Sequence, residues 1–363
     1  MEFNELLELM RDKEASDLHL RTGSPPVMRI DGKLVTLDLE PVDAEQTMAL
    51  ISDFMTEKQK QTFEEQLECD LAYTLIGVGR FRINVYRQKG SVNLAIRKVP
   101  EHIKSFQELG LLPVIQALSD NTRGLILVTG TTGCGKSTTL AAMINYINET
   151  RPCHIVTIED PIEYLFTDKK SIISQRELGF DTLNYLGALK HVVRQDPDVI
   201  LLGEMRDHET TAAAITAAQT GHLVLSTIHT VNATQTVTRV VDLFPPHQQL
   251  QIRYQLADTL KGVVSQRLLP HASGKGRVPA LEVLVVTPLV RKMIEDNNLS
   301  EISNCMKQGS YYGMQTFNQS LLNLYNSGEV TLEDALATAS NPEELMLAVR
   351  GVESGSTNPH MGQ

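Results

Sequence analysis

The stretch GLILVTGTTGCGKSTTLAAMINYI, residues 124–147, joins a short apolar segment to a helix-forming one through a glycine-rich loop. Its centre, GTTGCGKST, fits the phosphate-binding pattern G-x-x-x-x-G-K-[ST], which requires a strand before the loop and a helix after it. LILVT has the character of the strand and STTLAAMINYI that of the helix. In this arrangement backbone N–H groups and the helix N-terminus surround the phosphates of a nucleotide. The predicted nucleotide-binding residues are Gly130, Thr131, Thr132, Gly133, Cys134, Gly135, Lys136, Ser137 and Thr138.

Two side chains of this loop have defined roles in nucleotide chemistry. Lys136 is expected to reach the β and γ phosphates of ATP, and the hydroxyl of Ser137 is expected to be a ligand of Mg²⁺. The alternative is a glycine-rich turn that arose by chance, and it does not account for the strand and helix on either side. We therefore expect ATP and Mg²⁺ as cofactors.

A second strand-like segment, PDVILLGEMRD at residues 197–207, ends in a glycine and a group of charges. Its four consecutive apolar residues are typical of a central strand that is covered on both faces. Enzymes with this phosphate loop carry an acidic residue at the end of a neighbouring strand, facing Mg²⁺ and the attacking water. Glu204 occupies that position, so we predict that it orients or deprotonates water. Arg206 and Asp207 receive no role from the sequence.

Two further groups of polar residues accompany strand-like segments, and each has a simpler alternative. TIEDPIEY contains three carboxylates close together, which suits either a Mg²⁺ nucleotide site or a solvated acidic loop. GHLVLSTIHT places His222 and His229 at the two ends of one strand. A neutral imidazole both donates and accepts hydrogen bonds, so such a pair could couple the γ-phosphate to neighbouring elements. Single histidines are more often structural, and periodicity does not decide between these readings.

The pattern of the chain changes near residue 123. Before it, short β-branched segments, one short helix and the turn signal Asp31-Gly32 indicate a small α+β domain. After it, strands and helices alternate, which predicts an α/β fold with a largely parallel sheet. Beyond Pro245 the chain is expected to be mostly helical, apart from ALEVLVV. The predicted divisions are a first domain at 1–100, a linker at 101–122, an α/β domain at 123–350 and a disordered tail at 351–363.

Composition restricts the function classes open to this chain of 363 residues. A formal net charge of −11, with no Trp, argues against nucleic-acid binding as the main task, because phosphate backbones require basic surfaces. The four cysteines are scattered, without the spacing of a zinc site or a redox pair. No segment has the pattern of a signal peptide or the roughly 18 apolar residues of a membrane span. We therefore expect a cytoplasmic protein.

The order of the motifs resembles one family over nearly the whole chain. SDLHL, RIDGKL and RFRINVY come first, followed by the phosphate loop, HIVTIEDPIEY, QRELG, RQDPDVILLGEMRD, TGHLVLSTIHT and GMQTFNQSL. The chain is similar to the secretion-superfamily ATPases, and within them to the PilT/PilU family of type IV pilus retraction ATPases, which act in twitching motility. That resemblance implies an N-terminal PAS-like domain, a RecA-like P-loop ATPase domain and a homohexamer.

The resemblance also implies roles for individual residues. It implies an Asp box at residues 156–164, a His box, a Walker B glutamate that is the general base, and two arginines that contact the γ-phosphate of a neighbouring subunit. The matching residues are Glu163 for the Asp box, His222 and His229 for the His box, Glu204 for the base, and Arg82 and Arg97 for the arginine pair. Without the resemblance, Arg82 would be read as an exposed strand residue.

The activity implied by the resemblance is Mg²⁺-dependent ATP hydrolysis coupled to pilin depolymerisation. The implied partners are identical subunits of the ring, an inner-membrane pilus platform protein and a paralogous retraction ATPase. The implied location is the cytoplasm, peripheral to the pilus machine at the inner membrane.

Two departures from the family pattern keep alternatives open. Pilus extension and type II secretion ATPases carry a four-cysteine zinc motif after the His box, where this chain has only Cys305. Retraction ATPases carry A-I-R-N-L-I-R-E, where LVRKMIED at residues 289–296 has Glu295 in place of the second arginine. The first departure favours retraction over extension, and the second leaves open an accessory retraction ATPase of the PilU type. A nucleotide-gated scaffold with slow turnover is the non-enzyme alternative.

Overall fold

The computed structural model describes residues 2–30 and 32–351. The expected turn residue Asp31 and all but the first residue of the expected disordered tail lie outside the described residues. The chain forms two compact units: unit 1 is residues 1–102 with 163–165, and unit 2 is residues 103–162 with 166–363. None of the helices in the described part of the chain has the length and apolarity that a membrane crossing requires.

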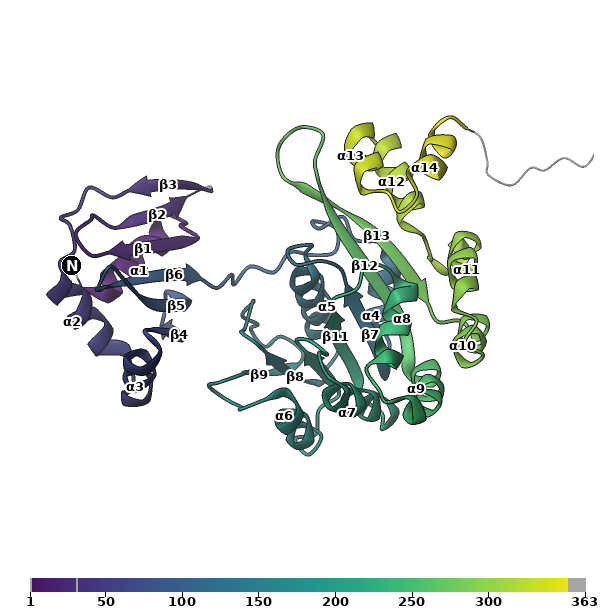
Figure 1. The fold of residues 1–363 in the computed structure, drawn as a ribbon, viewed down its shortest axis with the longest axis horizontal. Helices are drawn as coiled ribbons and strands as arrows, with labels where there is room; N and C mark the ends of the chain where they lie inside the picture. Colours follow the sequence, from purple (N-terminus) through teal and green to yellow (C-terminus); the bar gives the residue numbers. More distant parts are fainter. Residues whose placement is uncertain (1, 31, 352–363) are drawn as a thin grey trace, which may run out of the picture. The chain divides into compact units, whose positions relative to one another are not determined.

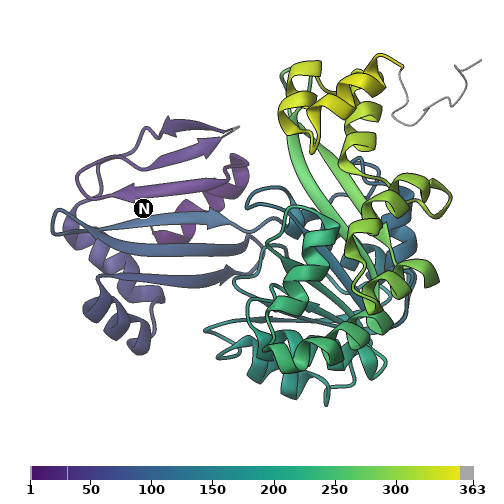
Figure 2. The ribbon, with the colours of Figure 1, turned by 45° about the vertical axis from the view of Figure 1, so that its right-hand side comes forward.

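Unit 1 is an antiparallel sheet with the strand order β3-β2-β1-β6-β5-β4 (Figures 1 and 2). Its strands are β1 (Asp17–Arg21), β2 (Val27–Ile30), β3 (Lys33–Thr36), β4 (Glu68–Leu75), β5 (Gly79–Gln88) and β6 (Ser91–Lys98). Its helices are α1 (Phe3–Asp12), α2 (Ala44–Phe54) and α3 (Glu57–Gln66). Leu18, Met28 and Leu94 of the strands form one apolar core with Phe3 and Leu7 of α1. The helices therefore cover one face of the sheet, and alternate residues of each strand form the opposite, polar face.

The expectation of one short helix in this part of the chain was incomplete, because α2 and α3 are also present. Each of these helices begins with a capping box, in which the side chain of Asp43 or Thr56 accepts a hydrogen bond from a backbone N–H three residues later. In return, the backbone N–H of each cap residue donates to the side-chain Oε1 of the glutamine at that later position, Gln46 or Gln59. This spacing is a recognisable start signal for a helix, even though the helices themselves are weakly amphipathic.

Unit 2 is built on a seven-stranded sheet with the order β13-β12-β7-β11-β10-β8-β9, in which every neighbouring pair is parallel except β12 and β13. The strands are β7 (Gly124–Thr129), β8 (His154–Glu159), β9 (Ile172–Glu177), β10 (Val199–Leu202), β11 (Leu223–Ile228), β12 (Leu260–Pro270) and β13 (Arg277–Val285). The predicted α/β fold with a largely parallel sheet is confirmed, and PDVILLG does form a central strand with β8 and β11 on its two sides.

Both faces of this sheet are covered by helices, as the run of apolar residues in β10 predicts. Ile200 and Leu202 belong to the core shared with α6 to α9, whereas Val199 and Leu201 belong to the core shared with α4 and α5. These helices are α4 (Pro113–Ser119), α5 (Lys136–Thr150), α6 (Tyr185–Val192), α7 (His208–Gln219), α8 (Ala233–Asp242) and α9 (Pro246–Thr259). A strand buried on both faces holds the residues that follow it in a fixed place, which suits a catalytic loop.

The expectation that the chain is mostly helical beyond Pro245 was wrong for residues 260–270, which form the long strand β12. Its polar residues obscured the strand signal, although two of them are buried with partners: Ser265 Oγ accepts from Thr129 Oγ1 at 2.8 Å, and Gln266 Nε2 donates to Thr139 Oγ1 at 2.9 Å. β12 therefore lies beside β7 and packs against the phosphate loop.

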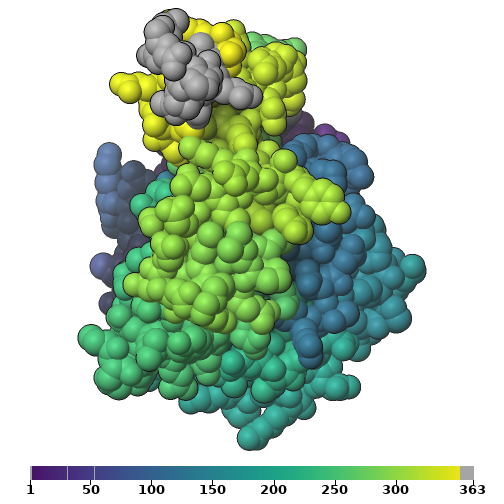
Figure 3. Space-filling view, turned by 90° about the vertical axis from the view of Figure 1, so that its right-hand side faces the viewer, coloured from purple at the N-terminus to yellow at the C-terminus, as the bar shows by residue number. Residues whose placement is uncertain are grey.

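After β13, short helices form the C-terminal part of unit 2, and Figure 3 shows the face that they present. They are α10 (Pro288–Glu295), α11 (Ile302–Gln308), α12 (Phe317–Asn326), α13 (Leu332–Thr338) and α14 (Pro342–Val349), with single 3₁₀ turns at Leu299–Glu301 and Ser310–Tyr312. Phe317 and Leu321 of α12 share a small core with Leu269 of β12, so α12 is anchored to the sheet hairpin, whereas α10 and α11 pack on the larger core of unit 2.

Candidate active site

The sheet of unit 2 brings the predicted site residues together because parallel strands end at the same edge. β7, β11, β10 and β8 are neighbours in that order, with Thr129 paired with Ile228 and Leu202 paired with both Ser226 and Ile158. The segments that follow these strands are the phosphate loop, the turn with His229, the turn with Glu204 and the acidic loop. Ligands of open α/β sheets bind beyond the carboxyl ends of the strands, which is where these four segments lie.

The phosphate loop wraps around the amino end of α5, which begins at Lys136 with Gly135 as its cap. Lys136 Nζ donates to the carbonyl oxygens of Gly130 and Thr131, each at 3.0 Å, so the ammonium group lies over the loop. The cap has no side chain to bond the first N–H groups of the helix. Within the described residues, the N–H groups of Gly133 and Gly135 have no backbone hydrogen-bond acceptor, whereas the N–H of Lys136 bonds the Cys134 thiol. A phosphate would supply those acceptors.

Gly130 is required because the loop passes very close to β12. A Cβ at this position would lie 2.5 Å from Cys134 Sγ and 2.5 Å from the carbonyl oxygen of Gln266. Cys134 is almost fully buried, and this burial raises the pKa of its thiol. Its side chain therefore packs under the loop, while its backbone forms part of the loop itself.

Glu204 is held by two cationic or polar neighbours at the end of β10. Its Oε2 accepts a hydrogen bond from Arg206 Nε at 2.6 Å, and its Oε1 lies 3.3 Å from His229 Nε2. The hydrogen bond and charge of Glu204 raise the pKa of Arg206 above its ordinary value. The turn is fixed from β11, because Thr227 Oγ1 donates to the carbonyl oxygen of Gly203 at 2.7 Å. Arg206, which had no role from the sequence, is thus a direct partner of the predicted base.

Tyr185 is a further residue of this site, and no sequence pattern indicated it. A Cβ on Gly203, the residue before Glu204, would lie 2.8 Å from Tyr185 Oη. Burial raises the pKa of the phenol far above its ordinary value, and the charges of Asp160, Glu204 and Glu159 raise it further. The phenol therefore stays neutral beside the turn at Gly203. Tyr185 is the first residue of α6, and only the fold of residues 160–200 brings it back to the turn.

The acidic loop does not behave as one solvated group. Glu159 is buried, and its Oε1 accepts hydrogen bonds from Thr157 Oγ1 at 2.7 Å and Gln175 Nε2 at 3.2 Å. Glu163 is about half exposed and belongs to unit 1, where its Oε1 lies 3.3 Å from Arg82 Nη2. The solvated-loop alternative is therefore wrong for Glu159.

The two predicted histidines lie at opposite edges of the sheet. His229 follows the carboxyl end of β11 and contacts Glu204. His222 precedes the amino end of the same strand, where its Nδ1 lies 2.9 Å from the carbonyl oxygen of Ala217 in α7. The six residues of β11 separate them by about 20 Å at the ordinary rise of a strand. Within one chain, therefore, His222 is not brought to the edge that carries Glu204.

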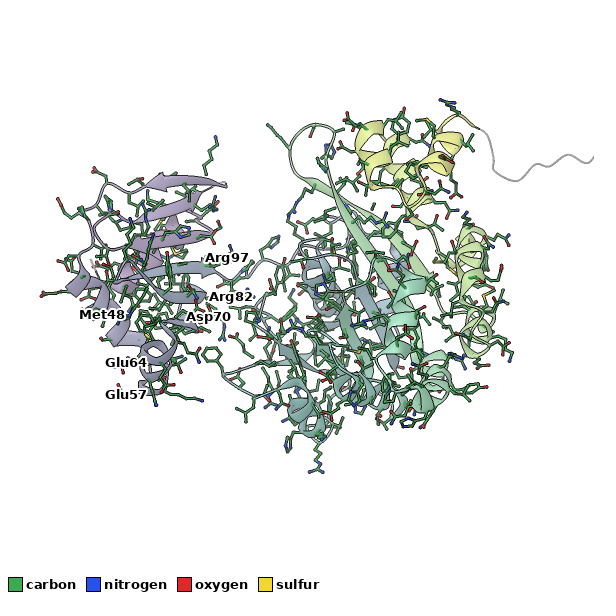
Figure 4. All side chains as sticks on the ribbon, viewed as in Figure 1. Met48, Glu57, Glu64, Asp70, Arg82 and Arg97 are labelled. Atoms are coloured by element: carbon green, nitrogen blue, oxygen red, sulfur yellow. The ribbon has the colours of Figure 1, made fainter. Side chains whose placement is uncertain are left out.

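The two predicted arginines lie side by side on the polar face of unit 1. Arg82 in β5 and Arg97 in β6 are direct cross-strand partners, and Figure 4 shows both on this sheet. The side chain of Arg97 is 67% exposed and that of Arg82 is 26% exposed. Arg97 is thus exposed, whereas Arg82 is partly buried and ion-paired with Glu163.

Known proteins are similar to this chain over nearly its whole length. Residues 2–337 match the family model described as Type II/IV secretion system protein. The chain is 44% identical over 343 residues to the type IV pilus retractation ATPase PilT of Pseudomonas aeruginosa, covering 94% of this chain and 99% of that protein. It is 42% identical over 355 residues to the type IV pilus ATPase PilU of the same organism, covering 98% and 93%.

A solved structure is similar over the same length. The crystal structure of the pilus retraction motor PilT with bound ADP superposes with a TM-score of 0.89 at 47% identity, covering 95% of this chain and 99% of that one. A match of this extent includes both units.

Proposed function

Because the chain belongs to the type II/IV secretion system protein family, we propose that it is an ATPase motor that retracts type IV pili. The observation that carries this proposal is the near full-length similarity to PilT, together with a phosphate loop and Glu204 at one edge of the sheet. The bound ADP in the similar PilT structure supports nucleotide binding by this chain. The work of the motor is the removal of pilin subunits, driven by ATP hydrolysis.

In the proposed reaction, Lys136 and the N–H groups of Gly133 and Gly135 bind the phosphates of ATP. The described residues contain no group of three or more His, Cys, Asp or Glu that could enclose a metal ion. Mg²⁺ commonly uses one or two protein oxygens together with substrate phosphates and water, and the Ser137 hydroxyl on the first turn of α5 fits that donor set. Bound there, Mg²⁺ would neutralise charge on the phosphates.

Glu204 is the proposed general base. Its carboxylate is oriented from two sides, by Arg206 and by His229, so it has a defined direction at the edge where the phosphates would lie. Orientation by hydrogen bonds is what a base needs in order to accept a proton from a positioned water. The neutral phenol of Tyr185 lies beside the same turn, next to Gly203.

Arg82 and Arg97 are proposed to contact the γ-phosphate of a neighbouring subunit in a homohexamer. Both lie in unit 1, on the polar face of its sheet, and arginines are suited to planar recognition of phosphate. Glu163, of the Asp box, and His222, of the His box, are proposed as further residues of the site. A platform protein at the inner membrane and a paralogous ATPase are the proposed partners of the ring, which would act from the cytoplasm.

A second candidate function is that of an accessory retraction ATPase of the PilU type. The similarity to PilU, which covers 98% of this chain, favours it, as does Glu295 in place of an arginine. Lys292 Nζ of α10 lies 3.7 Å from Glu295 Oε2 and 2.9 Å from Asp296 Oδ1. Glu295 is therefore ion-paired within its own helix. An accessory ATPase would support retraction only when its paralogue is present.

The test combines hydrolysis with retraction. Purified protein is assayed for Mg²⁺-dependent ATP hydrolysis, and the gene is expressed in strains that lack PilT, PilU or both. Recovery of twitching without PilT would support a self-sufficient motor, whereas recovery only in the strain that retains PilT would support the accessory function. A protein that neither hydrolyses ATP nor restores motility in any strain would contradict both.

A further inference from the structure

One cross-strand row on the sheet of unit 1 combines three arginines with a single aspartate. Arg29 in β2 is paired with Asp17 in β1, Asp17 is paired with Arg97 in β6, and Arg97 is paired with Arg82 in β5. Directly paired residues of antiparallel strands project from the same face, so these four side chains lie in line across the polar face. The sheet thereby places one buried carboxylate between two guanidinium groups.

Asp17 is a buried residue, only 8% exposed, and both oxygens of its carboxylate accept hydrogen bonds. Its Oδ1 accepts from Arg97 Nε at 2.8 Å, and its Oδ2 accepts from Ser16 Oγ at 2.8 Å. Arg29 Nε lies farther away, at 3.7 Å, and its Nη1 donates instead to the carbonyl oxygen of Gly32. Burial alone raises the pKa of Asp17, but the bonds from Arg97 and Ser16 outweigh it, so that the net pKa is lowered and the group stays charged.

Arg97 uses only one of its nitrogens in this contact. The bond to Asp17 engages Nε, whereas a two-point pairing with a carboxylate would also engage a terminal nitrogen. Among the described residues, neither Nη1 nor Nη2 of Arg97 has a partner, although Asp17 holds the guanidinium group through its Nε. The fork of terminal N–H donors is therefore oriented, exposed and open to a second anion.

We propose that Asp17 is the positioning residue of Arg97: it holds the guanidinium by Nε and thereby directs the two terminal nitrogens toward the phosphate of a nucleotide bound to a neighbouring subunit. This inference rests on the proposed role of Arg97 in the function above. An arginine on an exposed strand samples many rotamers, and a fixed one loses less freedom when it binds phosphate. Asp17 would then act through Arg97 without touching the nucleotide.

The sheet also supplies a matched control. Asp70 in β4 lies on the same face, two residues from the position that pairs with Arg82, and Figure 4 shows it beside that arginine. Asp70 Oδ1 accepts from Asn84 Nδ2 at 2.9 Å, so its partner is a neutral amide and not one of the proposed arginines. Removing either carboxylate deletes one cross-strand hydrogen bond, and removing Asp17 also deletes its longer ion pair with Arg29. Of the two carboxylates, only Asp17 bonds Arg97.

The test compares Asp17→Ala, Asp17→Asn and Asp70→Ala in the full-length protein, by steady-state ATP hydrolysis and thermal unfolding. Asp17→Ala is expected to lower kcat by about tenfold or more while the KM for ATP changes by less than about twofold, since the phosphate loop is untouched. Asp17→Asn keeps the shape and one acceptor oxygen, so its loss of kcat should be smaller. Asp70→Ala should leave kcat within about twofold of the wild type.

A double-mutant cycle separates positioning from mere stabilisation of the sheet. In an Arg97→Ala background, Asp17→Ala should have no further effect on kcat, because its action passes through Arg97. A further loss equal to that seen in the wild type, or an unchanged kcat in both Asp17 variants, would overturn the proposal while leaving the function intact. If Arg97→Ala alone retained full turnover, the role of Arg97 itself would be wrong. Should Asp17→Ala not fold, Asp17→Asn carries the same cycle.

Discussion

At the scale of single residues, the turn after β10 shows how much depends on close packing around one carboxylate. Gly203 leaves room for the Tyr185 hydroxyl, Arg206 and His229 orient Glu204, and Thr227 fixes the backbone from the next strand. The side chain of Glu204 is only 16% exposed, so its two partners are needed to offset the cost of removing it from water.

Replacement of Glu204 by glutamine should separate nucleotide binding from turnover. Glutamine keeps the size of the side chain but does not accept a proton, and general-base catalysis is typically worth about 10² to 10⁴ in rate. We expect Glu204→Gln to bind a fluorescent ATP analogue with near wild-type affinity and to lose hydrolysis by that factor. Glu209→Gln, on the exposed side of α7, is the control. Full hydrolysis by Glu204→Gln would remove it from the role of base.

The contact between Gly203 and Tyr185 predicts a pair of compensating substitutions. Gly203→Ala would place a Cβ 2.8 Å from Tyr185 Oη and should lower the free energy of unfolding by about 1–3 kcal/mol through overpacking. Tyr185→Phe removes the oxygen, so the double variant should recover part of that loss. Chemical denaturation of the two single variants and the double variant measures this coupling, and strictly additive losses would contradict the contact.

At the scale of elements, one buried carboxylate links two helices to the sheet. The carboxylate of Glu282 in β13 accepts two backbone hydrogen bonds. Ala233 N, the first of α8, donates to Oε1 at 2.8 Å, and Phe317 N, the first of α12, donates the other. Arg267 of the neighbouring strand lies over the ring of Phe317, 3.8 Å from its centroid. Since α8 follows the turn with His229, this carboxylate joins the edge of the proposed active site to the C-terminal helices.

The buried position of Glu282 predicts a pH dependence with a defined sign. Burial raises the pKa of this group above its ordinary value, about 4.3 for a glutamate, so the folded state binds its proton more tightly than the unfolded state does. Its contribution to stability is therefore greatest at low pH and is lost as the pH rises from the ordinary pKa to the raised one. Denaturation of the wild type and of Glu282→Gln across this range should show that loss in the wild type alone. A constant difference between the two proteins would contradict it.

At the scale of the whole molecule, the proposed catalytic groups are divided between the two units. The phosphate loop and Glu204 belong to unit 2, and the two arginines belong to unit 1. If the arginines act on the nucleotide of a neighbouring subunit, each active site is assembled from two chains. A ring built head to tail repeats this arrangement at every boundary.

Mixed rings test this division directly. Glu204→Gln and Arg97→Ala should each be nearly inactive alone, because every boundary in either ring lacks one group. The two variants are co-expressed with different tags, and rings that contain both are purified through the two tags. A boundary is intact where an Arg97→Ala subunit supplies Glu204 and its Glu204→Gln neighbour supplies Arg97. If subunits mix at random, about a quarter of the head-to-tail boundaries meet this condition. Recovered hydrolysis near that fraction supports action between chains. No recovery in rings shown to contain both variants would contradict it.

Much of the fold and part of the site could be predicted from short-range pattern. The phosphate loop, the strand before Glu204 and the α/β class depend on neighbouring residues, and local periodicity reports them well. β12 was missed because its buried polar residues, such as Ser265 and Gln266, have partners on other elements. The helices α2 and α3 were missed although their capping boxes were present in the sequence.

The sequence by itself determined the nucleotide loop, the candidate base and the family resemblance, because each is a run of residues with a required order. Only the tertiary structure decided that Arg206, His229 and Tyr185 surround Glu204, that His222 lies at the other edge, and that Asp17 holds Arg97 across 80 positions of sequence. Those contacts depend on strand order and register, which bring together side chains that are distant in the chain.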